Sequence, residues 1–107
     1  MKFFIRNNNV NAIMKRDGKL NIILKGSTAM KELKSSFPKS FLRIRNEMIE
    51  SGILKSQGEN FVFTQDYECS SPSKAGSLVV GTSSNGLTMW KNKDGKTLKW
   101  ILSRLEG

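Results

Sequence analysis

Basic side chains are the main source of chemistry in this sequence of 107 residues, which has 18 Lys and Arg against nine Asp and Glu. The net charge of +9 at pH 7 attracts polyanions, and lysine and arginine are the usual contacts to phosphates. We therefore predict nucleic-acid binding; the alternative is that the charge serves only solubility. The residues expected to meet phosphates are Lys15, Arg16, Lys19, Ser71, Ser73, Lys74, Lys91, Lys93, Lys96 and Lys99.

The charge is unevenly distributed along the chain. Residues 1–46 hold eleven bases and two acids, residues 47–68 one base and five acids, and residues 69–107 six bases and two acids. The acidic stretch, together with an exposed Trp100, supports an alternative in which the chain is a protein-interaction module.

The sequence lacks the residues that several kinds of catalytic or structural chemistry require. The chain has no histidine, so Ser-His and Cys-His catalysis have no base. The single cysteine, Cys69, excludes an intrachain disulfide and is expected to be a small buried side chain. No apolar run approaches the roughly 20 residues that span a bilayer, so we expect a cytoplasmic protein with no membrane contact.

Carboxylates offer a third alternative, a small metal-dependent hydrolase. Glu32 and Lys34 form an E-x-K pattern with Asp17 upstream, and Asp66 and Glu68 share one face of a predicted strand. Two carboxylates are too few to hold a catalytic ion. We therefore expect no enzymatic activity, no metal and no cofactor.

The first quarter of the sequence is typical of β-structure. Residues 3–5 form a short apolar strand, and residues 10–15 and 19–25 flank Arg16-Asp17-Gly18, a strong hairpin signal because glycine tolerates positive φ. Leu20, Ile22 and Leu24 share one face of the second hairpin strand, and Ile23 on the other face indicates that both sides are partly covered. Residues 28–35 are predicted to be either a helical turn or a mobile basic loop.

The rest of the sequence predicts three helices. They cover residues 36–51 with Pro38 near the start, residues 72–80 with Ser70 or Ser71 as cap, and residues 97–105 with Thr97 as cap. Residues 61–64 and 87–91 are predicted strands, and Asn85-Gly86 and residues 92–95 are predicted turns that need positive φ. Trp90 is expected in the core, and Trp100 half exposed.

These elements predict an α+β fold in which a small antiparallel sheet, built from the N-terminal hairpin strands, is covered by about three helices. The length suits one domain over residues 1–107. Its β-rich part is residues 1–27, and its helical part is residues 36–107.

A set of short motifs, spread over most of the chain, resembles a family of prokaryotic domains of unknown function. The quoted motif residues are Ser71, Pro72, Ser73, Gly81, Asn85, Gly86, Trp90, Lys91, Gly95, Lys96, Thr97 and Leu98. Residues 24–27 (LKGS), 42–52 and 61–67 also match the family's usual segments. Leu87 stands where the family's NGW motif has its aromatic residue.

That family is often attached to GIY-YIG nucleases and restriction-modification proteins, and it also looks like the restriction-enzyme-and-adenine-methylase-associated (RAMA) domains. The resemblance implies a compact α+β accessory domain that acts near DNA, with a nuclease or restriction-modification subunit as a possible partner. It implies no assigned activity.

Overall fold

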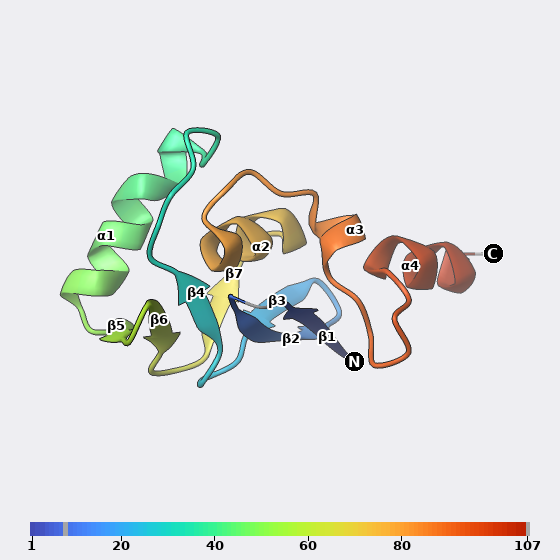
Figure 1. Ribbon diagram of the computed structural model, residues 1–107. Helices are drawn as coiled ribbons and strands as arrows, with labels where there is room; N and C mark the ends of the chain where they lie inside the picture. Colours follow the sequence, from blue (N-terminus) through green and yellow to red (C-terminus); the bar gives the residue numbers. More distant parts are fainter. Residues whose placement is uncertain (8, 107) are drawn as a thin grey trace.

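A computed structural model describes residues 1–7 and 9–106 and places two sheets and four α-helices among them (Figure 1). The strands are β1 (Lys2–Arg6), β2 (Asn11–Asp17), β3 (Leu20–Ile23), β4 (Thr28–Met30), β5 (Leu54–Gln57), β6 (Asn60–Phe63) and β7 (Tyr67–Cys69). The helices are α1 (Leu42–Glu50), α2 (Pro72–Val80), α3 (Gly86–Met89) and α4 (Leu98–Glu106), and a 3₁₀ turn (Lys39–Phe41) precedes α1. The predicted α+β class is confirmed.

The first sheet is antiparallel, in the order β1-β2-β3-β7. The predicted hairpin joins β2 to β3; its loop residues are Gly18 and Lys19, and Gly18 has a φ of +62°. Tyr67–Cys69 returns from the second half of the chain and pairs with β3. The sheet therefore combines segments that lie far apart in the sequence.

Ile23, expected on the opposite face from Leu20 and Ile22, lies on the more buried face of β3. Asn21 and Ile23 are buried, whereas Leu20 is 43% exposed. The amide of Asn21 accepts a hydrogen bond from Arg16 Nη1 at 2.7 Å and donates to the carbonyls of Lys19 and Cys69. Because these bonds satisfy the polar amide, Asn21 can take a core position beside Ile23, which the apolar pattern alone does not indicate.

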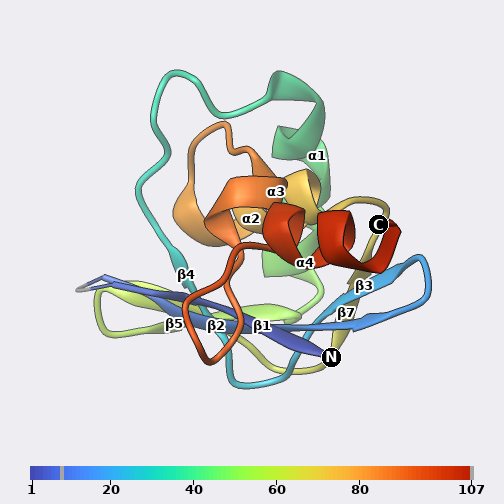
Figure 2. The same ribbon diagram turned by 90° about the vertical axis from the view of Figure 1, so that its right-hand side faces the viewer.

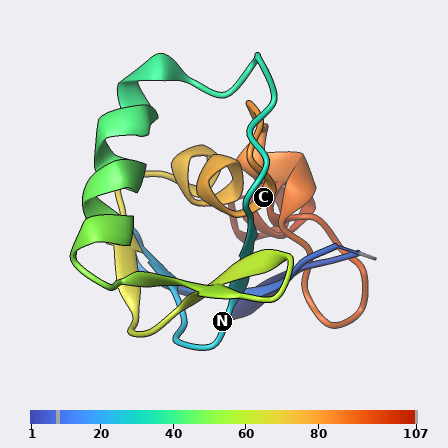
Figure 3. The ribbon, with the colours of Figure 1, turned by 60° about the vertical axis from the view of Figure 1, so that its left-hand side comes forward.

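The second sheet, in the order β4-β6-β5, includes two strands that the sequence pattern did not indicate. Residues 28–30 pair with β6 instead of forming a mobile loop, and residues 54–57 form a hairpin with β6 below α1 (Figure 3). Ser27 ties the two sheets together, because its Oγ accepts the N–H of Ile13 and its carbonyl accepts the N–H of Phe63.

Helix α1 is held to the second sheet by a buried arginine. Arg45 is 7% exposed and donates through Nη2 to the carbonyls of Met30 and Lys31, at 3.3 and 3.0 Å. Burial lowers the pKa of Arg45. The helix ends as predicted, with Gly52 just beyond it at a φ of +82°.

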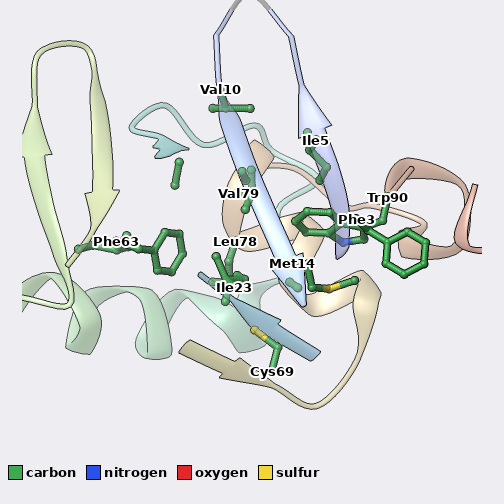
Figure 4. Packing of buried hydrophobic residues seen from close by; sticks show 14 of the residues in the cluster. Phe3, Ile5, Val10, Met14, Ile23, Phe63, Cys69, Leu78, Val79 and Trp90 are labelled. Carbon is green, nitrogen blue, oxygen red and sulfur yellow. The ribbon is translucent and has the colours of Figure 1, made fainter. Parts of the chain in front are cut away.

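Helix α2 packs on the inner face of the first sheet and supplies Ala75, Leu78 and Val79 to the core (Figure 4). Its predicted ends are confirmed. Ser71 Oγ accepts the N–H of Lys74 at 3.0 Å, and Gly81 closes the helix in the left-handed conformation.

The expected strand at residues 87–91 is instead the short helix α3 followed by an extended residue, Trp90. Asn85 caps α3 by accepting the N–H of Leu87, with an ordinary negative φ. Gly86 is required for close approach, since a Cβ there would lie 2.2 Å from the carbonyl carbon of Pro72. The positive-φ turn predicted at Asn85-Gly86 is therefore wrong.

The C-terminal predictions agree with the structure. Residues 92–95 form a turn in which Gly95 has a φ of +82°, and Thr97 Oγ1 accepts the N–H of Trp100 at the start of α4. Trp90 is fully buried, whereas Trp100 is 39% exposed.

Candidate nucleic-acid interface

One face of the first sheet is left open by the described helices, which all lie on its other side (Figure 2). Strand alternation and register decide which side chains share this open face. Lys2 lies opposite Lys15, Phe4 opposite Ile13, and Arg6 opposite Asn11. The face thus combines three cations with the half-buried apolar side chains Phe4 and Ile13.

Lys91 adds a fourth cation to the same face. It extends the sheet beyond β1 by exchanging two backbone hydrogen bonds with Phe4, at 2.7 and 3.1 Å. Directly paired residues of antiparallel strands point to the same side, so the side chain of Lys91 lies beside Phe4. Trp90, the preceding residue, correspondingly points into the core.

Phe4 is the centre of this arrangement. Lys2 and Arg6 lie two positions away along β1, and the guanidinium carbon of Arg6 is 4.1 Å from the ring centroid. We call Lys2, Phe4, Arg6, Lys15 and Lys91 the basic sheet face. Lys2 and Arg6 were missed at the sequence level, although their two-residue spacing around Phe4 in a predicted strand is a signal that could have found them.

A hollow of about 330 Å³ adjoins the basic sheet face. It is lined by Met1, Lys2, Phe4, Asn92 and Lys93. The side chain of Asn92 holds the turn by accepting the N–H groups of Asp94 and Lys96, at 3.0 and 2.9 Å. The turn thereby places Lys93 at the edge of the hollow.

The cations of the basic sheet face are not neutralised by ion pairs. The structure describes two ion pairs, Glu32–Lys34 and Arg43–Glu47, and neither includes a residue of this face. Two acids lie near these cations: Asp17 is two positions from Lys15 along β2, and Asp94 follows Lys93 in the turn. Glu68 lies on β7, the strand farthest from β1. The positive charge is therefore concentrated around β1.

Three other residues predicted to meet phosphates have roles within the fold. Arg16 donates to buried Asn21, Ser71 caps α2, and Ser73 Oγ accepts the N–H of Gly86 at 3.0 Å. A Cβ on Gly86 would lie 2.4 Å from the nitrogen of Ser73, so α3 covers the start of α2. Ser71 and Ser73 therefore lie where α3 packs on α2, and their hydroxyls are used within the fold.

The remaining predicted cations lie in three places that do not belong to the basic sheet face. Lys74 lies over the ring of Phe41 at 5.7 Å, on the side of α1, and Lys19 lies at the β2–β3 loop. Lys96 and Arg104 flank Trp100, at 5.0 and 4.6 Å from the ring centroid, and exposed Lys99 lies on the same helix. This second basic cluster, formed by Lys96 just before α4 and by residues of α4, follows directly after the turn that carries Lys93.

The carboxylates that suggested a hydrolase are separated by the fold. Glu32 pairs with Lys34, Asp17 ends β2, and Asp66 Oδ1 accepts the backbone N–H of Lys25 at 2.8 Å. Within residues 1–7 and 9–106, no three Asp, Glu or Cys side chains form a group suited to a metal ion. Cys69 is buried, as predicted, and burial raises its pKa to about 12.

The residues of the interaction-module alternative do not share a surface. The acidic stretch 47–68 covers α1, β5, β6 and the start of β7, whereas Trp100 lies on α4 at the other end of the molecule (Figure 1). No helix in the described part of the chain combines the length and apolar character needed to cross a membrane.

The chain belongs to a family defined as a domain of unknown function, DUF4357, whose model matches residues 3–102. The match spans both sheets and most of α4. Neither a curated protein nor a solved structure gives a significant match.

The motif residues that carry the resemblance mostly build the frame of this fold. Ser71, Asn85 and Thr97 cap helices, and Gly81 and Gly95 adopt positive φ. Two further pairs are joined by hydrogen bonds, Trp90 to Pro72 and Gly86 to Ser73. Leu98 is buried. Among the motif residues, Lys91 alone belongs to the basic sheet face.

Proposed function

We propose that this domain is a non-enzymatic module that binds nucleic acid, and DNA in particular, through the basic sheet face. One observation carries the proposal: cations from β1, β2 and residue 91 gather around Phe4 on a face that the described helices leave open. Lysine and arginine on such a surface supply the phosphate contacts that dominate nucleic-acid affinity.

The biological setting we propose follows from the resemblance noted above. An accessory domain of this kind would hold a nuclease or restriction-modification subunit near DNA in the cytoplasm. The open basic face is compatible with that role, because phosphate contacts give affinity without requiring a base sequence.

The charge count sets an expected salt dependence. Four or five phosphate contacts, from Lys2, Arg6, Lys15 and Lys91 with Lys93 beside them, predict that log affinity falls with log salt at a slope of about −4 for a duplex and about −3 for a single strand. A titration of fluorescently labelled DNA at several salt concentrations measures this slope. Absence of binding at low salt, or a slope near zero, would reject the proposal.

A matched pair of variants tests whether the basic sheet face is the surface used. Lys15→Ala with Lys91→Ala removes two cations of the face, and the slope should become shallower by about 2. Lys39→Ala with Lys55→Ala removes the same charge from exposed sites on the 3₁₀ turn and β5. Equal loss in both double variants would show that only net charge matters and would refute this interface.

A further inference from the structure

We infer that the nucleic acid bound by the basic sheet face is single-stranded and that one of its bases stacks on the ring of Phe4. This inference rests on the proposed function and adds to it the form of the ligand. Its basis is an aromatic ring set among four cations on an open sheet, which is unlike a purely electrostatic surface.

The position of Phe4 distinguishes single strands from duplexes. A half-buried side chain on a sheet cannot reach the face of a base inside a duplex, because each base is stacked between its neighbours. The bases of a single strand expose their faces, and aromatic side chains on open sheets bind them by stacking. Cations around the ring then meet the phosphates on either side of the stacked base.

The spacing of the face suits this arrangement. At about 3.3 Å per residue, Lys2 and Arg6 lie some 13 Å apart along β1 with Phe4 between them. Lys91 and Ile13 flank Phe4 across the sheet, at one strand spacing on each side. A backbone running along β1 would therefore meet a cation before the ring and another after it.

The ring already accepts a planar partner, since the guanidinium of Arg6 lies over it at 4.1 Å. Arg6 is exposed, and base–aromatic stacking is stronger than a cation–π contact in water. A base can therefore displace the guanidinium, and the long side chain of Arg6 then turns to a phosphate. The hollow beside Phe4, lined partly by Met1 and Asn92, gives the edge of that base a place to lie.

The test compares a labelled single-stranded thymidine oligomer with a duplex of equal length at the same salt. Wild-type protein should bind the single strand at least tenfold more tightly. Phe4→Leu should weaken single-strand binding about tenfold, leave duplex binding unchanged and preserve the salt slope, whereas Phe4→Tyr, which keeps a ring, should bind like wild type. Thermal melting of each variant checks that the fold is retained.

Each outcome separates the two proposals. Equal or tighter binding of the duplex by wild-type protein overturns the single-strand inference, and so does a Phe4→Leu variant that binds the single strand normally. In either case the proposed function stands if the salt slope of the Lys15 and Lys91 double variant is still shallower than that of the wild-type protein. If neither nucleic acid binds at low salt, the proposed function itself fails.

Discussion

The indole Nε1 of Trp90 donates a hydrogen bond to the backbone carbonyl of Pro72, at 2.9 Å, from a fully buried ring. This contact joins the first turn of α2 to the segment that extends the sheet beyond β1. The core and the basic sheet face therefore share a structural support, because Trp90 directly precedes Lys91. The same contact explains why the buried ring is a tryptophan rather than a phenylalanine.

Trp90→Phe should destabilise the fold by about 2 kcal/mol, because the carbonyl of Pro72 loses its partner and the smaller ring leaves a void. Trp100→Phe is the matched control, since Trp100 is 39% exposed and should cost less than about 0.5 kcal/mol. Urea denaturation measures both free energies of unfolding. Equal losses in the two variants would contradict the role assigned to Trp90.

Gly86→Ala should be among the most damaging small substitutions, at about 3 kcal/mol. The added Cβ would lie 2.2 Å from the carbonyl carbon of Pro72 and 2.4 Å from the nitrogen of Ser73, so backbone must move. In Gly58→Ala the added Cβ meets no atom within 4 Å, so the free energy of unfolding should fall only by about 1 kcal/mol, which is the cost of a φ of +61°. Thermal or chemical unfolding compares the two variants. A smaller loss of stability in Gly86→Ala than in Gly58→Ala would refute the close packing of α3 on α2.

Arg45→Met should cost about 2 kcal/mol, because the carbonyls of Met30 and Lys31 lose their donor. Arg43→Met is the control on the same helix. Arg43 is exposed and pairs only with Glu47 one turn away, a contact worth about 0.3–0.5 kcal/mol. The free energies of unfolding of both variants decide the point, and similar values would show that Arg45 does not tie α1 to β4.

Alkaline pH should weaken the fold through Cys69. Burial raises the pKa of this thiol from 9.0 to about 12. Because the folded pKa is the higher one, the stabilising effect is complete below about pH 9 and is lost as pH rises from about 9 toward about 12. At pH 10.5 the expected loss relative to pH 8 is about 2 kcal/mol. Cys69→Ala should lack this part of the pH dependence, and parallel profiles for the two proteins would disprove it.

Local chemistry explains which elements could be predicted from sequence. Ser71 before Pro72, Thr97 before an amphipathic run, and Asp94-Gly95 each define a helix start or a turn through neighbouring atoms alone. The burial of Asn21 could not be found that way, because its amide has a partner in Cys69, from another part of the chain, besides its local partners Arg16 and Lys19. The dipeptide Asn85-Gly86 was similarly misleading, since its glycine serves packing against Pro72.

The candidate site likewise contains residues that could be predicted from local sequence and one that could not. The alternation of Lys2, Phe4 and Arg6 is local and visible in the sequence. The position of Lys91 beside Phe4 depends on a pairing between nearly opposite ends of the chain, which no local pattern encodes. Ser73 was predicted on the phosphate-binding surface because its bond to Gly86 depends on a partner 13 residues away in another element. The bond from Arg16 to Asn21 is local, since both residues belong to one hairpin.

The pairing of Phe4 with Lys91 has a consequence for biosynthesis. Strand β1 is translated before the other elements of this domain, yet its outer edge has no partner until residue 91 has emerged, after both sheets and α2 have been translated. Contacts of such long sequence separation form slowly. A nascent or truncated chain that ends before residue 91 therefore lacks the complete set of cations around Phe4, and the proposed nucleic-acid binding would require the finished domain.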